Sequence, residues 1–429
     1  MKRVVGAALA LFFGSCACEP PAIDQLRFAC TTTDQCIEGH VCSEGECVRA
    51  ELVADAGRDA GTSTDAGTDA GTPDSGTMDS GTPDAGASDA GSPDAGTPDS
   101  GTPDAGGTDS GMPDAGDWWD ARFTHRRRLV IATTTAVDTG YAVRVTFDHA
   151  ALVSANKSRT NGDDVRLVCR EATWVERDRI LDTGRAWNTN TSALWFRVPV
   201  GIAASSFNDR CYLYYGFATA GAPPTNRANV FLFFDDFESN SLNKWTRDTD
   251  GGQWAVSNTE SHGGTYALSY PVESDEGHAI VANPALNVAD VFVESWWYLD
   301  HDSMDLSQLV RVQPLGDNYQ TNLEGSGGWD LARVLNGSWS EVEPNQRAPV
   351  SGTWMRVGLG IEGTRMRAFI DEVAVTPPGG SFDIGTDLAS GNIGLSKWNV
   401  GVGGVVYFDD VTVRPWVESE PTVLVGPEE

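Results

Sequence analysis

The sequence predicts an all-β protein with two β-sandwich domains behind an export signal, a small cysteine-rich segment and a disordered acidic linker. From residue 117 onward, short segments alternate apolar and polar residues, as in 140–149 (GYAVRVTFDH) and 291–299 (VFVESWWYL). Gly, Asn, Asp and Pro separate these segments, as expected for turns between strands. Beyond the N-terminal signal, no stretch of ten residues shows a convincing helical period.

Residues 1–15 have the organisation of an export signal. Lys2 and Arg3 precede an apolar run that is too short to anchor in a bilayer. The following FGSC resembles the bacterial lipobox, which implies that Cys16 receives diacylglycerol and becomes the new N-terminus. Cys18 remains an alternative acceptor because its use would leave an even number of cysteines before the linker. An ordinary signal peptide is the third interpretation.

The cysteine-rich segment, residues 16–50, is too small to build a hydrophobic core. We expect two disulfides there, with the connectivity open, among Cys30, Cys36, Cys42 and Cys47. A zinc site with four thiolate ligands is the alternative to the disulfides, but the segment contains no CxxC pair. The segment resembles small cysteine knots of myxobacterial lipoproteins.

The composition of residues 51–116 predicts a disordered spacer. From Asp69 to Asp114 every fifth residue is Asp, and no apolar side chain larger than Met interrupts the repeat. Such a segment cannot bury enough surface to offset the entropy of ordering, and its Pro residues and like charges should keep it extended. We expect it to hold the C-terminal domains away from a membrane.

Residues 117–230 contain a recognisable series: WWDARFTHRRRLVI, NGDDVRLV, ALWFRVPV, CYLYYG and RANVFLFFDDFE. The series resembles the domain of unknown function 2341, which implies a β-sandwich found in bacterial surface and secreted proteins but implies no chemistry. Cys169 and Cys211 each fall in phase with inward-pointing residues of their segments. A disulfide between them is our prediction, and two buried thiols are the alternative.

Residues 231–418 begin with FFDDFE and end with VYFDDVTVRP, and SHGGTYALSYP follows the opening motif. These motifs resemble the concanavalin A-like lectin and glucanase jelly roll (LamG-like), which implies that the first and last strands lie side by side. The resemblance also implies a structural Ca²⁺ with Asp236, Glu238 and Asp409 as ligands, and with Asp235 and Asp410 as adjacent alternatives. Asp pairs that merely cap strand ends are the other interpretation. Residues 419–429 are predicted to be a tail.

The jelly roll lacks the signature of a glycosidase. Retaining enzymes of this fold need two carboxylates about 5 to 5.5 Å apart, which residues two or four apart on one strand provide. No Glu-x-Asp-x-(x)-Glu pattern, Gly-x-Ser-x-Gly elbow or His-Glu-x-x-His pair is present. Alternation places Glu294, Trp296 and Tyr298 on one face of 291–299, where aromatic and polar groups would suit a sugar. Further candidates are Trp329, Arg333 and Trp339. The alternative for each Trp is packing in the core or against the preceding sandwich.

The sequence therefore predicts an exported protein, lipid-anchored to the bacterial envelope at the outer membrane or cell surface, that binds polysaccharide without cleaving it. Its partner would be a glycan or a surface protein. A net charge of -31 argues against nucleic acid. Two alternatives remain open: a glycoside hydrolase with an atypical site, and a structural or adhesive envelope protein.

Overall fold

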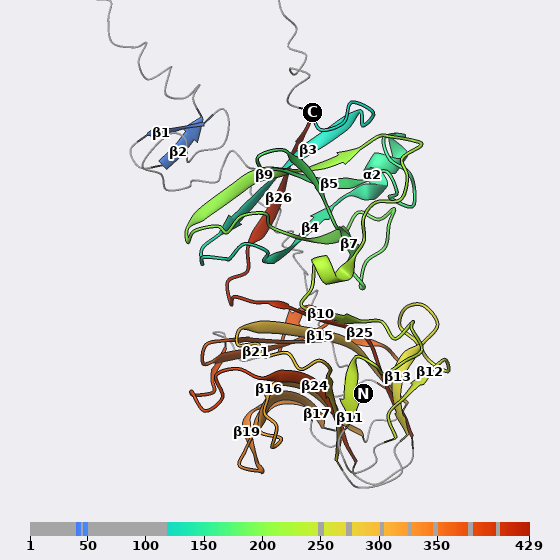
Figure 1. Ribbon diagram of the computed structural model, residues 1–429, viewed down its shortest axis with the longest axis vertical. Coiled ribbons are helices and arrows are strands. Elements are labelled where there is room, and N and C mark those ends of the chain that lie inside the picture. The colour runs from blue at the N-terminus through green and yellow to red at the C-terminus, as the bar shows by residue number, and fades with distance from the viewer. Residues whose placement is uncertain are drawn as a thin grey trace, which may run out of the picture.

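The computed structural model describes residues 40–43, 46–49, 118–247, 253–271, 277–300, 304–324, 328–345, 351–375, 381–399 and 404–429. Two β-sandwiches account for nearly all of these residues (Figure 1), so the all-β prediction is confirmed. The described residues contain no helix with the length and hydrophobicity that crossing a bilayer requires.

The predicted export signal, the lipidation site at Cys16, Cys30, Cys36 and the spacer lie outside the described residues. Before residue 118, only a hairpin is described. Its strands, β1 (His40–Ser43) and β2 (Glu46–Arg49), are antiparallel and place Cys42 opposite Cys47.

The first sandwich packs a five-stranded sheet against a three-stranded one. In spatial order, the larger sheet contains β26 (Thr422–Glu428), β3 (His125–Thr133), β9 (Ser206–Tyr215), β5 (Arg166–Arg170) and β6 (Trp174–Arg177). The smaller sheet contains β4 (Ala142–Phe147), β8 (Ser192–Arg197) and β7 (Ile180–Leu181). Two short helices complete this sandwich, α2 (His149–Ser154) and η3 (Arg227–Asn229).

The predicted disulfide joins the central strand of the larger sheet, β9, to its neighbour β5. Cys169 on β5 lies directly opposite Cys211 on β9, both side chains are buried, and their sulfur atoms are bonded. The inward phase that the alternation predicted for both residues is confirmed, since they belong to the core of this sandwich.

The end of the chain corrects the prediction of a tail over 419–429. After the second sandwich the chain returns to the first, where β26 pairs with β3 from Thr422 opposite Ala132 to Val425 opposite Leu129. Figure 1 shows β26 in red beside β3. Val423 and Val425 pack against the core of the first sandwich, and this burial explains why so short a segment is ordered. The second sandwich is thus inserted between two strands of the first.

The second sandwich, the jelly roll, has two large sheets. One is a nine-stranded sheet made of β12 (Ala255–Ser257), β13 (Ala267–Pro271), β25 (Val405–Pro415), β15 (Val291–Leu299), β20 (Met355–Glu362), β21 (Arg365–Ile370), β22 (Val373–Ala374), β10 (Phe233–Asp235) and β23 (Phe382–Asp383). As predicted, β10 and β25, the first and last of its strands in sequence, lie side by side.

The other is a seven-stranded sheet. In spatial order it contains β11 (Trp245–Arg247), β14 (His278–Ala282), β24 (Asn392–Asn399), β16 (Met304–Val312), β17 (Asn318–Glu324), β18 (Gly328–Leu335) and β19 (Ser338–Asn345). Trp297, Tyr319 and Trp329 are among the large side chains buried between the two sheets.

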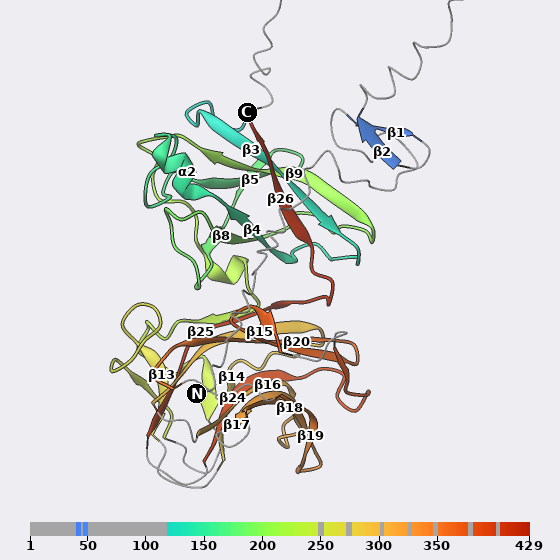
Figure 2. The ribbon, with the colours of Figure 1, turned by 180° about the vertical axis from the view of Figure 1, so that it is seen from behind.

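The two sheets of the jelly roll face different surroundings. The nine-stranded sheet, with β15, β25 and β20, lies next to the first sandwich, and the seven-stranded sheet lies on the far side (Figures 1 and 2). One outer face of the jelly roll is therefore turned toward the first sandwich, while the other is turned away from it.

Candidate functional site

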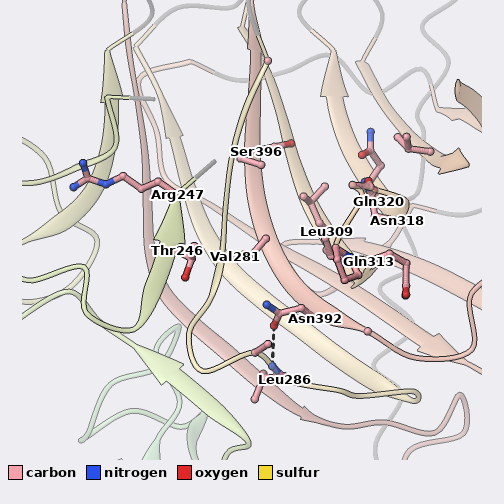
Figure 3. Close-up of a pocket in the computed structure, with 18 of the residues that line it drawn as sticks. Thr246, Arg247, Val281, Leu286, Leu309, Gln313, Asn318, Gln320, Asn392 and Ser396 are labelled. Carbon is pink, nitrogen blue, oxygen red and sulfur yellow. Dashed lines mark hydrogen bonds between the residues drawn. The ribbon is translucent and has the colours of Figure 1, made fainter. Parts of the chain in front are cut away.

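The outer face of the seven-stranded sheet carries a groove with a volume of about 660 Å³, which we call the outer groove. Figure 3 shows side chains from several strands converging on it. Its lining comes from β11, β14, β24, β16, β17 and β18, and from the loops that follow β14 and β16. The groove therefore runs across the strands, and strand register decides which residues share its floor.

One row of the floor can be followed across six strands. Residues directly opposite each other in neighbouring antiparallel strands share a face. The pairings link, in order, Ala332, Gln320, Leu309, Gly394, Val281 and Thr246. With about 4.8 Å between strands, five intervals make this row about 24 Å long. Gly394 at its middle is covered by neighbouring atoms, because a Cβ there would meet Ile280 O at 2.7 Å and Val281 Cγ1 at 3.0 Å.

A second row lies two residues further along the same strands and is more polar. The pairings link, in order, Asp330, Asn322, Ser307, Ser396 and Ala279. Three side chains form no hydrogen bond within the described residues: Ser307 and Ser396 on this row, and Gln320 on the first row. Their hydroxyl and amide groups are thus left to bind a ligand or water.

Two exposed tryptophans flank these rows. Trp398 on β24 lines the groove, is 55% exposed, and lies over Gly277, where a Cβ would meet its ring at 2.6 Å. Trp339 on β19 is 49% exposed and lies opposite Val334, another lining residue, so it shares the face of the groove. Large aromatic rings that remain this exposed offer flat apolar surfaces to a ligand.

Side-chain amides fix the edge of the groove. Asn392 accepts a hydrogen bond from the backbone N–H of Leu286, drawn as a dashed line in Figure 3, and donates to the carbonyl of Ala282. Gln313 donates to the carbonyls of Arg311 and Ser390. These bonds hold the loops that follow β14 and β16 against the sheet, so the walls are preorganised before a ligand arrives.

Carboxylates are absent from the part of the groove lining that the structure describes. None of its described lining residues is Asp or Glu. On the same face of the sheet, Asp330 accepts a hydrogen bond from Asn322 Nδ2 at 2.6 Å, and Asp305 is paired in the strand register with Trp398. These two acids lie on strands separated by β17, hence about 10 Å apart across the sheet alone. That separation is too large for a retaining pair.

The predicted binding face of β15 does not lie on the side of the outer groove. Glu294, Trp296 and Tyr298 do share a face, but this face is turned toward the first sandwich. The indole N–H of Trp296 donates to Thr183 Oγ1 of the first sandwich at 3.0 Å, and its ring stacks on His262 with centroids 3.6 Å apart. Trp296 therefore serves packing, the alternative left open by the sequence.

The remaining predicted binding residues have different positions. Trp329 is buried in the core against Trp297, with ring centroids 5.4 Å apart, so it cannot meet a ligand. Arg333 donates to Ser340 and lies 3.6 Å from Asp387, outside the groove. Trp339 alone lies on the face of the groove. Sequence reasoning missed Trp398, although its alternation with Gly394 and Ser396 was a usable signal.

The predicted calcium ligands hydrogen-bond mainly to backbone N–H groups. Glu238 Oε1 accepts from Thr265 and Tyr266, each at 2.7 Å, while Asp409 Oδ2 accepts from His262 and Gly263. Burial and the neighbouring Asp410 charge raise the pKa of Asp409 to about 8.

Asp236 lies 4.0 Å from Arg227. Within the described ranges, no group of three or more His, Cys, Asp or Glu side chains is placed to hold a metal ion. Glu238 and Asp409 both hydrogen-bond to the loop around 262–266, and calcium binding stays a prediction.

A serine and a histidine also meet in the first sandwich. His149 Nε2 lies 3.0 Å from Ser158 Oγ, which in turn donates to Asp164 at 3.0 Å. His149 Nδ1 accepts the backbone N–H of Asn188, so Nε2 must carry the proton of the neutral ring. Burial lowers the pKa of His149 and favours this neutral form. With its proton on Nε2, the ring cannot accept a proton from Ser158, and the trio is structural.

Comparison with known families identifies part of the chain. Residues 161–257 match the family described as Domain of unknown function (DUF2341). The predicted presence of this domain is confirmed, but the match extends beyond the expected boundary at 230 and ends at β12 of the jelly roll. No curated protein matches the chain.

Several solved structures are similar to part of the chain at low sequence identity. Carbohydrate binding module CBM66 from Bacillus subtilis is 17% identical over 40% of this chain and 96% of its own length, with a TM-score of 0.33. A prokaryotic β-1,3-1,4-glucanase (lichenase) from a mouse hindgut metagenome is 13% identical over 43% of this chain and 99% of its own length, also with a TM-score of 0.33. A Bacteroides ovatus GH16 protein from a mixed linkage glucan locus is 13% identical over 42% of this chain and 99% of its own length, again with a TM-score of 0.33.

Proposed function

We propose that this protein binds polysaccharide in the outer groove without cleaving it, while displayed on the bacterial surface. The main observation behind the proposal is the composition of the groove, which combines unpaired hydroxyl and amide groups with two exposed tryptophans. Aromatic rings stack on the apolar faces of sugar rings, and hydroxyl and amide groups bind sugar hydroxyls.

The length of the groove favours a polymer over a single sugar. A row of about 24 Å spans several consecutive sugar units, so each unit can contribute a small contact. A stacked ring contributes about 1 kcal/mol beyond its buried area. Two such rings with a few hydrogen bonds correspond to affinities between about 1 μM and 1 mM.

The described residues that line the groove include no Asp or Glu, which supports binding without cleavage. Hydrolysis by either stereochemical route requires an acid and a second carboxylate flanking the scissile bond. The lining of the groove includes Asn318, Gln320 and Ser396. These side chains can form hydrogen bonds to hydroxyl groups, but they have no charge to stabilise an oxocarbenium-like transition state.

The N-terminal features determine where binding would take place. We propose that Cys16 is lipidated and that the spacer of residues 51–116 extends the two sandwiches from the membrane toward glycans or surface proteins. Metabolic labelling with a palmitate analogue should mark the wild type and fail for Cys16→Ala. Labelling that survives in Cys16→Ala but not in Cys18→Ala would move the anchor to Cys18.

A glycan array probed with the full chain tests the binding function, and the two sheets of the jelly roll offer a matched pair of variants. Trp398→Ala should lower the affinity for the best glycan about fivefold, because it removes one stacked ring worth about 1 kcal/mol. Trp296→Ala, which changes the face turned toward the first sandwich, should leave the affinity unchanged.

The same preparation also tests for cleavage. Reducing-end assays on every bound glycan should detect no product. Product release would favour a glycoside hydrolase, and a blank array together with a captured surface protein would favour the adhesive alternative. Equal binding by wild type and Trp398→Ala would show that the proposed groove is wrong.

A further inference from the structure

A second cavity lies between the two sandwiches, on the opposite side of the jelly roll from the outer groove. This junction cavity has a volume of about 450 Å³ and is lined by β4 and β8 of the first sandwich, by β15, β20 and β25 of the jelly roll, and by the returning segment 420–424. Small-molecule sites occur preferentially at such interfaces and have volumes of about 300 to 1,000 Å³.

The charged groups of the junction cavity are balanced. Its lining contains three arginines and three glutamates: Arg144, Arg356, Arg414, Glu294, Glu372 and Glu420. Arg356 donates to Glu294 and Glu372, Arg144 donates to Glu372, and Arg414 is paired with Glu420. Because the charges cancel, the cavity has no excess charge to attract a small anion or cation.

The walls are held rigidly. The Arg414 guanidinium lies between two rings, 4.7 Å from the centroid of Trp195 and 4.4 Å from that of Phe292. Trp195 is fixed in turn by a hydrogen bond from its indole N–H to Asp182 at 2.8 Å. Side chains fixed in this way lose little entropy when a ligand binds.

Two charged side chains keep hydrogen-bonding capacity that the protein does not use. Glu294 accepts a hydrogen bond from Arg356 at Oε1. Its other carboxylate oxygen, Oε2, has no hydrogen-bond partner among the described residues. Arg144 uses only Nη1, which leaves its Nε and Nη2 hydrogens. Both side chains are partly accessible, at 15% for Glu294 and 30% for Arg144. The cavity thus offers a free acceptor and free donors at fixed positions.

We propose that the junction cavity binds a small, uncharged, hydroxyl-rich molecule of the mono- or disaccharide class. A hydroxyl group both donates and accepts, so one hydroxyl of the ligand donates to Glu294 Oε2 while another accepts from Arg144. The exposed Thr146 on β4 also lines the cavity. This site shares no residue with the outer groove and does not depend on the function proposed there.

Saturation-transfer NMR and calorimetry on the full chain test this site with glucose, galactose, mannose, xylose, N-acetylglucosamine, maltose and cellobiose. At least one sugar should bind, and glucuronate should bind more weakly than glucose because its charge is not matched. Thr146→Trp should fill the cavity and lower the affinity at least about tenfold. Glu294→Gln, which keeps the shape but weakens the acceptor, should also lower it. Unchanged melting temperatures confirm that both variants fold.

Trp398→Ala in the outer groove is the matched control and should leave the affinity for these small sugars unchanged. The proposal is overturned if no sugar of the panel binds, if Thr146→Trp and Glu294→Gln both bind like the wild type, or if only Trp398→Ala loses binding. The last result would assign the small sugars to the outer groove and leave the polysaccharide proposal intact.

Discussion

Arg356 of the jelly roll donates hydrogen bonds to both carboxylate oxygens of Asp182 in the first sandwich, at 2.8 and 3.0 Å. Both side chains are almost completely buried. Asp182 also accepts from Trp195 and Arg144, while Arg356 also donates to Glu294. This pair connects the two sandwiches through a buried network, so we expect them to unfold together.

Breaking the buried pair should therefore destabilise the whole unit. Asp182→Ala removes the partner of a buried guanidinium, a change that costs about 3 to 5 kcal/mol in other proteins. The urea midpoint of the full chain should fall accordingly. Asp120→Ala, which removes the partner of the exposed Arg122, is the control and should leave the midpoint unchanged. Equal midpoints for wild type and Asp182→Ala would show that the junction is not coupled to folding.

The same network predicts loss of stability in acid. Burial opposes ionisation of Asp182, but the charges and hydrogen bonds of Arg356 and Arg144 outweigh it and hold the pKa of this carboxyl well below its usual range. Arg144 likewise helps to lower the pKa of Glu372 against the effect of burial. A group with a depressed folded-state pKa stabilises the protein above its unfolded pKa, about 4, and this contribution is lost as the pH falls further.

Melting temperatures measured between pH 7 and pH 2.5 test this pH dependence. The wild type should lose stability below about pH 4, and Asp182→Asn should lose less over the same interval because it cannot be protonated. Parallel pH profiles for the two proteins would assign the acid sensitivity to other groups.

The returning strand predicts that the first sandwich needs the end of the chain. A chain that stops at Glu418 lacks β26, the ion pairs of Glu428 with Lys157 and of Glu429 with Arg126, and the packing of Val423 and Val425. Without β26, β3 becomes an exposed edge strand that is prone to aggregation.

Hydrogen exchange can detect this change directly. Amides of 125–133 should lose protection in the truncated chain, while Thr422→Ala, which changes an exposed side chain of β26, should keep it. If the amides of 125–133 keep wild-type protection in the truncated chain, residues 419–429 are a tail that the first sandwich does not need.

Calcium binding, predicted from the resemblance of the sequence, can be tested by its effect on stability. An ion that binds only the folded state raises the melting temperature by mass action. Excess Ca²⁺ should therefore raise the melting temperature of the full chain relative to a chelator, and Asp409→Asn should abolish the difference. Identical curves with and without Ca²⁺ would show that the backbone N–H groups around Asp409 are its only partners.

Local alternation predicted much of this protein correctly. It identified the strands around 140–149 and 291–299, placed Cys169 and Cys211 in the core, and assigned Glu294, Trp296 and Tyr298 to one face of β15. These features depend on the period of two residues along a strand, which neighbouring residues encode without reference to the rest of the chain. The resemblance to the concanavalin A-like jelly roll, by contrast, implied that β10 and β25 lie side by side, and they do.

Only the tertiary structure decided which of these faces is free. Alternation states that Trp296 and Trp297 point to opposite sides, but not that the first sandwich covers one of them. The floor of the outer groove requires the register of six strands that are distant in sequence, from Thr246 to Gly394, and β26 gains its partner nearly 300 residues before it in the chain. Side-chain direction is a local property, whereas strand order and the packing of one sandwich on another depend on long-range contacts that form together.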